Sequence, residues 1–313
     1  MCGCGIIGLT IALELLKRGH RDITIIEKED EIGLHASGRN SGILHAGIYY
    51  SPDSLKAKSC ITGNRLMKEY CKEKGLPLLE TGKVIVTKDE SEIDTLHELY
   101  KRARANGSPV KLIDEHELSE IEPNAKTIKE ALFSPETAII DPKSILKSMY
   151  NDCLSSKVNI LTGRKFTGIS DDNVAITSKE KIGFNTFINA SGAYSDRVAG
   201  IFSVGSEFRL IPFKGTYRKL TEEKSGHVRG NIYPVPNIKN PFLGVHFSRG
   251  ISGEVFIGPT AIPALGRENY GFVKGLDREA FPILFKDGAL FFLNSAFRQI
   301  ALMEPRKYFK RYF

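Results

Sequence analysis

The stretch MCGCGIIGLTIALEL, residues 1–15, decides the first half of the fold. Gly3, Gly5 and Gly8 have the spacing G-x-G-x-x-G, and an apolar helical period continues from them to Gly19, a residue suited to end a helix. Such glycines allow a tight turn and a close approach of the backbone to a phosphate, and the helix N-terminus behind them favours negative charge. The pattern predicts a dinucleotide-binding turn, with a turn that only packs as the alternative.

The segment that follows supports the nucleotide interpretation. DITIIEKE (22–29) predicts a short buried strand, and Glu27 near its end is where an acid binds a ribose in such units. Cys2 and Cys4 allow a second interpretation as metal ligands, but a structural zinc site needs about four ligands and no second short-spaced cysteine pair exists. We therefore expect no metal. Because so few residues precede the glycines, we also expect the first strand of the unit to be missing.

Length and composition restrict the class of protein. A chain of 313 residues predicts two lobes, and five scattered cysteines are typical of a reducing compartment. No apolar run is long enough to cross a membrane, and no secretory signal opens the sequence. The net charge of +7 suits anionic small molecules, an anionic membrane surface or simply a basic solvated surface. We expect no nucleic-acid partner.

The order of the predicted elements indicates a mixed α/β (α+β) fold. Helices are predicted over 54–75, 90–107, 114–123 and 143–155, and strands over 82–88, 158–161, 165–170, 173–178 and 184–188. From about 207 to 260, short strands separated by Pro, Gly and Asn favour an antiparallel sheet. We expect a Rossmann-like βαβ lobe from residues 1–75 and 140–205, interleaved with an antiparallel-sheet substrate lobe from 76–139 and 206–290, and a divergent tail at 291–313.

The loop LHASGRNSGILHAGIYY (34–50) carries a second group of candidate functional residues. Its small polar side chains and glycines suit an extended cofactor. His45 is flanked by Ala46 and Gly47, which leave room beside its imidazole. A packed loop with a structural histidine is the alternative from these residues alone.

Several segments together resemble a known family. EKEDEIGLHASGRNSGILHAGIYYSPDSLKAKSC (27–60), which follows the glycine turn, resembles the L-2-hydroxyglutarate oxidases/dehydrogenases, FAD-dependent proteins of the D-amino-acid oxidase-like superfamily. The similarity continues through INASGAYSDRVA (188–199), IPFKGTYRKL (211–220) and PFLGVHFSRG (241–250) and covers roughly residues 2 to 275. It narrows the nucleotide from NAD or FAD to FAD.

The resemblance also implies a site. FAD would be bound by Gly3, Gly5 and Gly8 at its pyrophosphate, by Glu27 at its adenosine ribose, by Ser37, Asn40, Ser41 and Gly42 toward the flavin ring, and by the backbone of Ala190, Ser191 and Gly192. L-2-hydroxyglutarate, a 2-hydroxy dicarboxylate, would be oxidised to 2-oxoglutarate by hydride transfer from C2 to the flavin N5. A histidine suits the proton removal because its pKa lies near neutrality. His45 is the first candidate base and His246 the second.

The same resemblance suggests substrate contacts and leaves alternatives open. Lys214, Arg249, Tyr217 and Tyr233 are expected to bind the dicarboxylate. The electron acceptor would be oxygen or a quinone. A related flavin oxidase of an amino acid or of glycerol 3-phosphate, or a non-catalytic remnant, are the other hypotheses.

The resemblance ends near residue 275, so we expect a chain truncated at both ends that binds FAD weakly or not at all. We expect the protein in the cytoplasm, or peripherally at the inner face of a membrane, where the basic, aromatic tail RKYFKRYF (306–313) would make contact.

Overall fold

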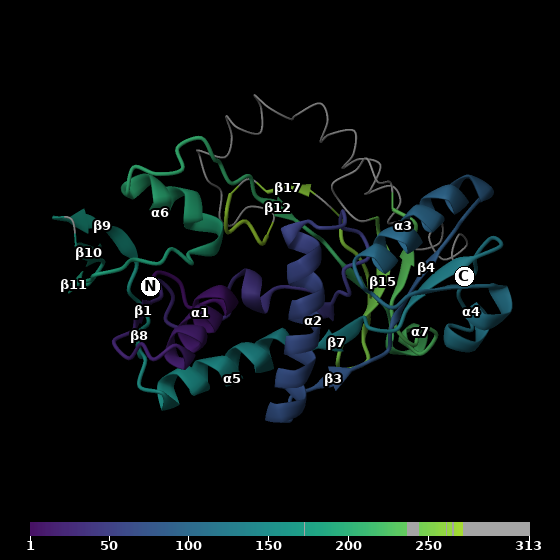
Figure 1. The fold of residues 1–313 in the computed structure, drawn as a ribbon, viewed down its shortest axis with the longest axis horizontal. Coiled ribbons are helices and arrows are strands. Elements are labelled where there is room, and N and C mark those ends of the chain that lie inside the picture. The colour runs from purple at the N-terminus through teal and green to yellow at the C-terminus, as the bar shows by residue number, and fades with distance from the viewer. Residues whose placement is uncertain (172, 237–243, 261, 265, 272–313) are drawn as a thin grey trace. The chain divides into compact units, whose positions relative to one another are not determined.

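The computed structural model describes residues 1–271, apart from 172, 237–243, 261 and 265 (Figure 1). The chain forms two compact units. The first contains Met1–Asn40, Pro142–Pro212 and the described residues 266–271, and the second contains Ser41–Asp141 and the described part of 213–264. Residues 41–75, expected in the nucleotide lobe, therefore group with the second unit. The predicted tail at 291–313 lies outside the described residues.

The first unit is built from helices around short parallel pairings. Its elements are α1 (Ile6–Lys17), β1 (Thr24–Ile26), the 3-10 turn η1 (Ala36–Gly38), α5 (Pro142–Ser155), β8 (Asn159–Leu161), β9 (Phe166–Ser170), β10 (Val174–Thr177), β11 (Lys181–Gly183), the 3-10 turn η3 (Gly192–Tyr194) and α6 (Ser195–Ile201). The prediction of a strand over 184–188 is wrong: β11 ends at Gly183, and residues 184–188 form no strand before the single bridge at Asn189.

The expectation that the first strand is missing is wrong in one respect. Cys2 forms parallel bridges to Ile26 on one side and to Asn189 on the other. The N–H groups of Gly3 and Ala190 donate to the carbonyl oxygens of Ile26 (2.8 Å) and Cys2 (2.8 Å). Because β1 also pairs in parallel with β8, these first residues occupy the position between β1 and residues 188–190 that the strand of a βαβ unit takes.

Two apolar contacts complete the first unit. Helix α1 packs against α5, beside which it lies in Figure 1, and buries Leu9 and Ala12. The antiparallel strands β9, β10 and β11 form a separate sheet. A cluster of aromatic rings joins that sheet to the segment after β11 and to the end of α6: Phe166, Phe184, Phe187 and Phe202. These contacts fix the glycine turn between a strand and a helix.

The second unit carries most of the strands. Its elements are β2 (Ile43–Leu44), α2 (Leu55–Lys74), β3 (Leu78–Leu79), β4 (Lys83–Val86), the 3-10 turn η2 (Glu90–Glu92), α3 (Ile93–Ala105), β5 (Lys111–Ile113), α4 (Glu115–Ile121), β6 (Ala131–Ser134), β7 (Ala138–Ile140), β12 (Phe213–Lys214), β13 (Arg218–Lys219), α7 (Glu222–Ser225), β14 (Ile232–Pro234), β15 (His246–Arg249), β16 (Val255–Gly258) and β17 (Ile262–Pro263). In the part of the chain that the structure describes, no helix is both long and apolar enough to cross a membrane.

A seven-stranded sheet of order β13-β16-β15-β14-β4-β6-β5 organises this unit. The expected antiparallel pairing holds for its strand pairs except one: β14 and β4 run in parallel, with Tyr233 opposite Ile85. Two smaller groups, β2-β7-β3 and β12-β17, lie outside this sheet.

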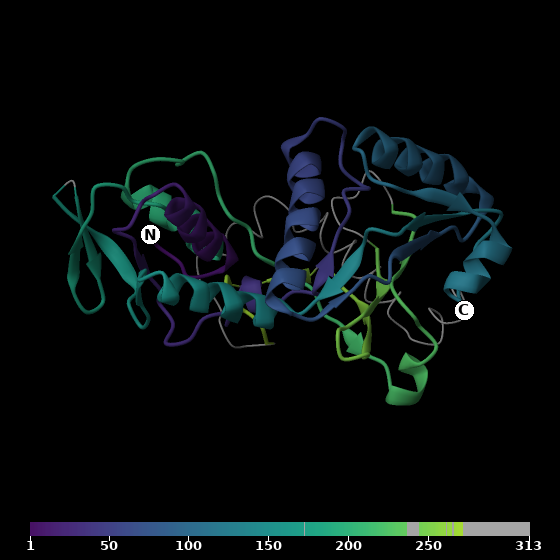
Figure 2. The ribbon, with the colours of Figure 1, turned by 60° about the horizontal axis from the view of Figure 1, so that its bottom comes forward.

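The two faces of the sheet bury different residues. Val84 and Val86 of β4 pack with Phe247 of β15 on one face, in a cluster that includes Leu118 of α4. Ile85 packs on the other face with Tyr233 and with the buried side of α3, which lies along this sheet in Figures 1 and 2. Since side chains alternate along a strand, Lys83 and His246 share the face of Ile85 and Tyr233.

Candidate functional site

The glycine turn of the first unit leaves almost no room for side chains. A Cβ at Gly3, whose φ is +107°, would lie 2.3 Å from the Ala190 carbonyl oxygen, and a Cβ at Gly8 would lie 2.0 Å from the Gly3 carbonyl oxygen. These two glycines are required by the packing of the turn itself. A Cβ at Gly5 would meet only the Ser37 hydroxyl, 2.9 Å away. Gly5 is thus the glycine whose missing side chain leaves space next to a polar group.

The loop after β1 closes on the start of α1. The Ile6 N–H, in the first turn of the helix, donates to Ser37 Oγ (3.0 Å). The amide of Asn40 holds the loop by donating to the carbonyl oxygens of Ala36 (3.2 Å) and Ser37 (3.0 Å). The first N–H groups of a helix lack partners within it and favour an anion. A glycine turn, a helix N-terminus and a serine hydroxyl therefore fit the pyrophosphate of FAD.

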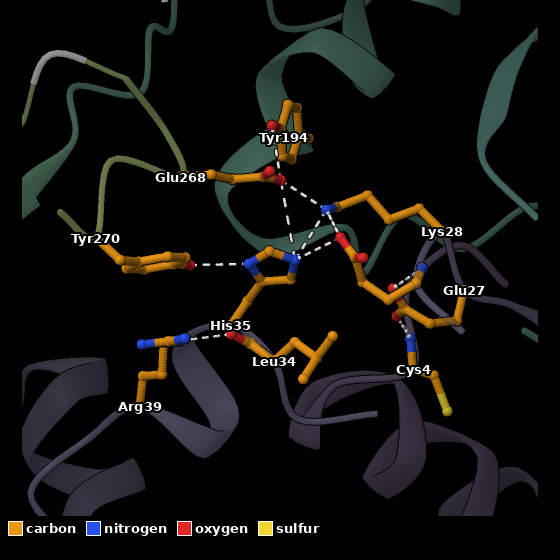
Figure 3. Close-up of polar contacts among 10 residues, drawn as sticks. Cys4, Glu27, Lys28, Leu34, His35, Arg39, Tyr194, Glu268 and Tyr270 are labelled. Atoms are coloured by element: carbon orange, nitrogen blue, oxygen red, sulfur yellow. Dashed lines mark hydrogen bonds and ion pairs between the residues drawn. The ribbon is translucent and has the colours of Figure 1, made fainter. Parts of the chain in front are cut away.

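Glu27, the predicted ribose-binding acid, follows β1 and lies beside the glycine turn. Its carboxylate accepts hydrogen bonds from the N–H groups of Cys4 (2.9 Å) and Glu29 (3.1 Å), which fix it beside the turn (Figure 3). The adjacent thiols are poor metal ligands because burial raises the pKa of Cys2 to about 11 and that of Cys4 to about 12. Among the described residues, neither belongs to a group of three side chains placed to hold an ion.

The remaining predicted cofactor residues are divided between the units. Ala190, Ser191 and Gly192 stay in the first unit, where the Ala190 carbonyl approaches Gly3 and the Ser191 hydroxyl donates to Asn189 Oδ1 (2.6 Å). Ser41, which is exposed, and Gly42, whose carbonyl accepts from the Ile140 N–H (2.9 Å), belong to the second unit. Their contacts with a flavin remain predictions.

A polar network that the sequence did not predict lies next to Glu27. Figure 3 shows the ammonium of Lys28 between the carboxylates of Glu29 and Glu268 and the imidazole of His35. The Lys28 Nζ lies 2.6 Å from Glu268 Oε1 and 2.8 Å from His35 Nε2. The phenol of Tyr194 also donates to Glu268 (2.8 Å).

The charges in this network compensate one another. Burial lowers the pKa of Lys28, but its hydrogen bonds to Glu268 and Glu29 outweigh this and raise it. The hydrogen bond from Lys28 likewise lowers the pKa of Glu29. Glu29, His35 and Glu268 have the spacing of a metal site, but the Lys28 ammonium already contacts all three. The network therefore joins residues 28–35 to residue 268.

The second unit brings both predicted histidines to one place. The rings of Tyr233 and His246 lie with their centroids 3.7 Å apart, and those of His45 and Tyr233 lie 6.4 Å apart. Burial, together with the nearby charge of Lys83, lowers the pKa of His45 to about 3; burial also lowers the pKa of His246 to about 3. Both imidazoles are neutral at ordinary pH. The buried Nδ1 of His45 has no hydrogen-bond partner among the described residues, whereas that of His246 contacts the Gly244 carbonyl (2.8 Å).

Lys83, which the sequence analysis did not single out, lies behind these rings. Its side chain is 1% exposed, and its Nζ lies 4.5 Å from the centroid of the Tyr49 ring and 4.7 Å from that of Tyr233. Burial lowers its pKa to about 7. The only signal in the sequence is that a lysine opens the otherwise apolar run KVIV, and alternation cannot reveal an inward lysine in such a run.

Helix α2 holds the backbone that carries His45. The buried amide of Asn64 donates to the carbonyl oxygens of Leu44 (3.2 Å), His45 (3.1 Å) and Glu136 (3.0 Å). The thiol of Cys60, one turn earlier on the helix, donates to the same His45 oxygen (3.3 Å). These contacts fix the short strand β2, and the histidine that follows it, against the helix.

The four predicted substrate residues have different surroundings. Tyr233 is part of the histidine cluster, and the charge of Tyr217 acts on the pKa of Tyr233. Arg249 instead donates to the Val228 carbonyl (2.6 Å) from the far end of β15. Lys214 is half-buried on β12, which pairs with β17. Substrate binding by these four residues stays a prediction.

Comparisons with known proteins agree with the glycine turn. A family described as DAO, FAD dependent oxidoreductase, matches residues 2–297. The L-2-hydroxyglutarate dehydrogenase, mitochondrial, of Nematostella vectensis is 38% identical over 87% of this chain and 63% of its own length, and that of Homo sapiens is 36% identical over 86% and 61%. The chain thus spans less than two thirds of these relatives.

A solved structure has a similar fold. It is the dithionite-reduced L-alpha-glycerophosphate oxidase of Mycoplasma pneumoniae with FAD bound, which superposes with a TM-score of 0.73 at 26% identity and covers 94% of this chain and 79% of that one. The family match extends over both units, beginning at Cys2, and includes the glycine turn, Glu27 and His45. The chain belongs to the DAO family of FAD-dependent oxidoreductases.

Proposed function

We propose that the protein binds FAD and oxidises L-2-hydroxyglutarate to 2-oxoglutarate. The observation that supports this choice of substrate is the 36–38% identity to L-2-hydroxyglutarate dehydrogenases over most of this chain. FAD, when bound, accepts the hydride that leaves C2. The glycine turn and Ser37 would hold its pyrophosphate, and Glu27 its adenosine ribose.

The second unit supplies a proton acceptor for this reaction. His45 is neutral at ordinary pH, and its Nδ1 has no partner among the described residues, so this atom is free to take the proton of the 2-hydroxyl group. Its pKa of about 3 is lower than the near-neutral value expected of a catalytic histidine, and it must rise for His45 to hold that proton; the negative charge of a bound dicarboxylate acts in this direction. As the hydroxyl loses this proton and C2 loses a hydride, two electrons leave the substrate and a ketone forms. His246 stays the second candidate: its Nδ1–H donates to the Gly244 carbonyl, which leaves Nε2 as its basic nitrogen.

Oxidation of glycerol 3-phosphate is the second candidate. The similar fold and 26% identity of the L-alpha-glycerophosphate oxidase favour it, but the identity to the hydroxyglutarate dehydrogenases is higher. The proposal further includes oxygen or a quinone as electron acceptor. It places the protein in the cytoplasm or at the inner face of a membrane, although the names of the relatives place those proteins in mitochondria.

Anaerobic reduction of bound flavin tests this function. The full chain is purified with added FAD and mixed with L-2-hydroxyglutarate, its D-enantiomer, proline or glycerol 3-phosphate. We expect L-2-hydroxyglutarate alone to remove the absorbance of oxidised flavin, and His45→Ala to slow this at least about 100-fold, since a general base contributes about 10²–10⁴-fold. His97→Ala is the matched control because His97 pairs with Glu130 at a half-exposed position on α3. Reduction by proline or glycerol 3-phosphate instead would reject the proposed substrate.

A further inference from the structure

The cluster around Lys83 contains a buried positive charge without a counter-ion. Among the described residues, no carboxylate lies within ion-pair distance of its ammonium, and its one hydrogen bond goes to the Tyr49 hydroxyl oxygen (3.3 Å). Burying an ammonium costs several kcal/mol unless a partner compensates it. A methionine would fill the same space without this cost. The position therefore favours an anion that the protein itself does not supply.

Tyr49 is the hydrogen-bond partner of this ammonium and packs against the cluster that contains Tyr233. The Tyr49 hydroxyl oxygen accepts a hydrogen bond from the Lys83 ammonium, and the hydroxyl proton of Tyr49 has no acceptor among the described residues. Tyr49 is half-buried, whereas Lys83 is closed off by the tyrosine rings. Of the two side chains, Tyr49 is the one that retains exposed surface.

We propose that Tyr49 donates a hydrogen bond to one carboxylate of the substrate and that Lys83, hydrogen-bonded behind it, supplies the compensating positive charge. This inference rests on the proposed function in taking the anion to be a 2-hydroxy dicarboxylate that places its hydroxyl group at His45. Lys83 is then a positioning residue that acts through Tyr49, and it makes the site selective for anionic substrates.

The pKa of Lys83 differs from the pKa values of the titratable groups around it. The titratable groups that face it are His45 after β2, Tyr49, Cys60 of α2, Tyr233 of β14 and His246 of β15. Burial lowers the pKa of both histidines to about 3 and raises those of Tyr49, Cys60 and Tyr233. Lys83, with its pKa lowered to about 7, is the group among them that titrates near neutral pH.

A bound carboxylate must raise the pKa of Lys83, because its negative charge lies near the ammonium and favours the charged form. Binding therefore takes up a proton at pH values above 7, and affinity falls as pH rises from about 7 to 9. We expect Lys83→Met to weaken binding by about tenfold to a hundredfold, the range of a hydrogen bond involving a charge, and to remove this pH dependence. Lys83→Arg keeps its charge, so binding should persist without the pH dependence.

Calorimetric titration of the full chain with 2-oxoglutarate measures this directly. Titrations at pH 8 in two buffers of different ionisation heat give the proton uptake, and the uncharged dimethyl ester of 2-oxoglutarate is the ligand control. Lys219→Met is the matched control, because Lys219 is exposed and pairs with Glu254. It should leave the dissociation constant unchanged.

Three results would overturn the inference: no binding by the wild-type chain, binding without proton uptake, or a dissociation constant unchanged in Lys83→Met. If Lys83→Met does not fold, Tyr49→Phe decides, with an expected loss of about threefold to tenfold for one hydrogen bond. Lys83-dependent binding of 2-oxoglutarate without flavin reduction by L-2-hydroxyglutarate would reject the proposed function but keep the anion site. Flavin reduction by L-2-hydroxyglutarate that is unchanged in Lys83→Met would keep the proposed function but reject the anion site.

Discussion

The ion pair between Asp196 and Arg267 allows a test of how the first unit is held together. The two side chains are 6% and 9% exposed, and Arg267 donates from Nη1 to Asp196 Oδ1 (2.6 Å) and from Nη2 to Oδ2 (2.8 Å). Two backbone N–H groups, of Arg197 (2.9 Å) and Leu210 (3.0 Å), also donate to the carboxylate. Asp196→Asn keeps the shape of the side chain but removes its charge and one acceptor oxygen.

The pKa of Asp196 sets the size and sign of the effect. Burial opposes ionisation, but the hydrogen bond from Arg267 outweighs it and lowers the pKa from 3.8 to about 2. A difference of about 2 units corresponds to roughly 2–3 kcal/mol of folding free energy. Because the folded-state pKa is the lower one, this stability is complete above about pH 4 and is lost as pH falls toward 2. Leaving Arg267 buried without its counter-ion, with the Ala193 carbonyl as a remaining acceptor, brings the expected loss at neutral pH to about 3–5 kcal/mol.

Urea denaturation followed by circular dichroism at pH 7 measures this loss. Glu180→Gln is the matched control, since it breaks the more exposed pair with Arg164 and should cost no more than about 1 kcal/mol. Replacing Asp196 and Arg267 together by Leu and Met should recover much of the loss, because no buried charge is then left unpaired. If Asp196→Asn unfolds within 1 kcal/mol of wild type at pH 7, the pair does not stabilise the unit as argued.

Two further predictions concern the two sites. Asn64→Ala should lower the unfolding free energy by about 2–4 kcal/mol, since the carbonyl groups of Leu44 and Glu136 lose this donor and that of His45 keeps only the Cys60 thiol. It should also slow flavin reduction by displacing His45, and a loss of stability without a change in rate would contradict the positioning role. Gly5→Ala should weaken FAD binding at least about tenfold with a smaller loss of stability than Gly8→Ala, which should impair folding. The reason is that a new Cβ meets the Ser37 side-chain hydroxyl in the first case and backbone in the second; fluorescence titration with FAD and thermal unfolding distinguish the two variants.

Local sequence signals predict the helices and the glycine turn well because their causes are local. The helix predicted over 54–75 is confirmed as α2, whose first turn is capped by the Ser54 hydroxyl and whose end is Gly75 in the left-handed conformation. The helix predicted over 143–155 is likewise confirmed as α5. Capping residues and helical periods act over a few residues, so a sequence contains the whole signal.

The surroundings of the histidines depend on strand register, which the sequence does not reveal. Tyr233 meets Ile85 because β14 pairs in parallel with β4, although the two strands are far apart in the chain. The prediction of an antiparallel lobe gave no reason to place Lys83 beside Tyr233. A shift of one residue in either strand would turn these side chains to the opposite face. His45 could be proposed as a base from its loop, but its buried cationic neighbour could not.

The roles of the three glycines show why a motif alone cannot establish a cofactor site. Gly3 and Gly8 are required even without a ligand, since their missing side chains make room for the backbone at Ala190 and at Gly3 itself. A chain that only packs its helix against its sheet would need both. Gly5 differs because its missing side chain makes room beside the Ser37 hydroxyl, at the start of a helix. The middle glycine, together with the loop that carries Ser37, is therefore the part of the pattern that distinguishes a nucleotide-binding turn from a packed one.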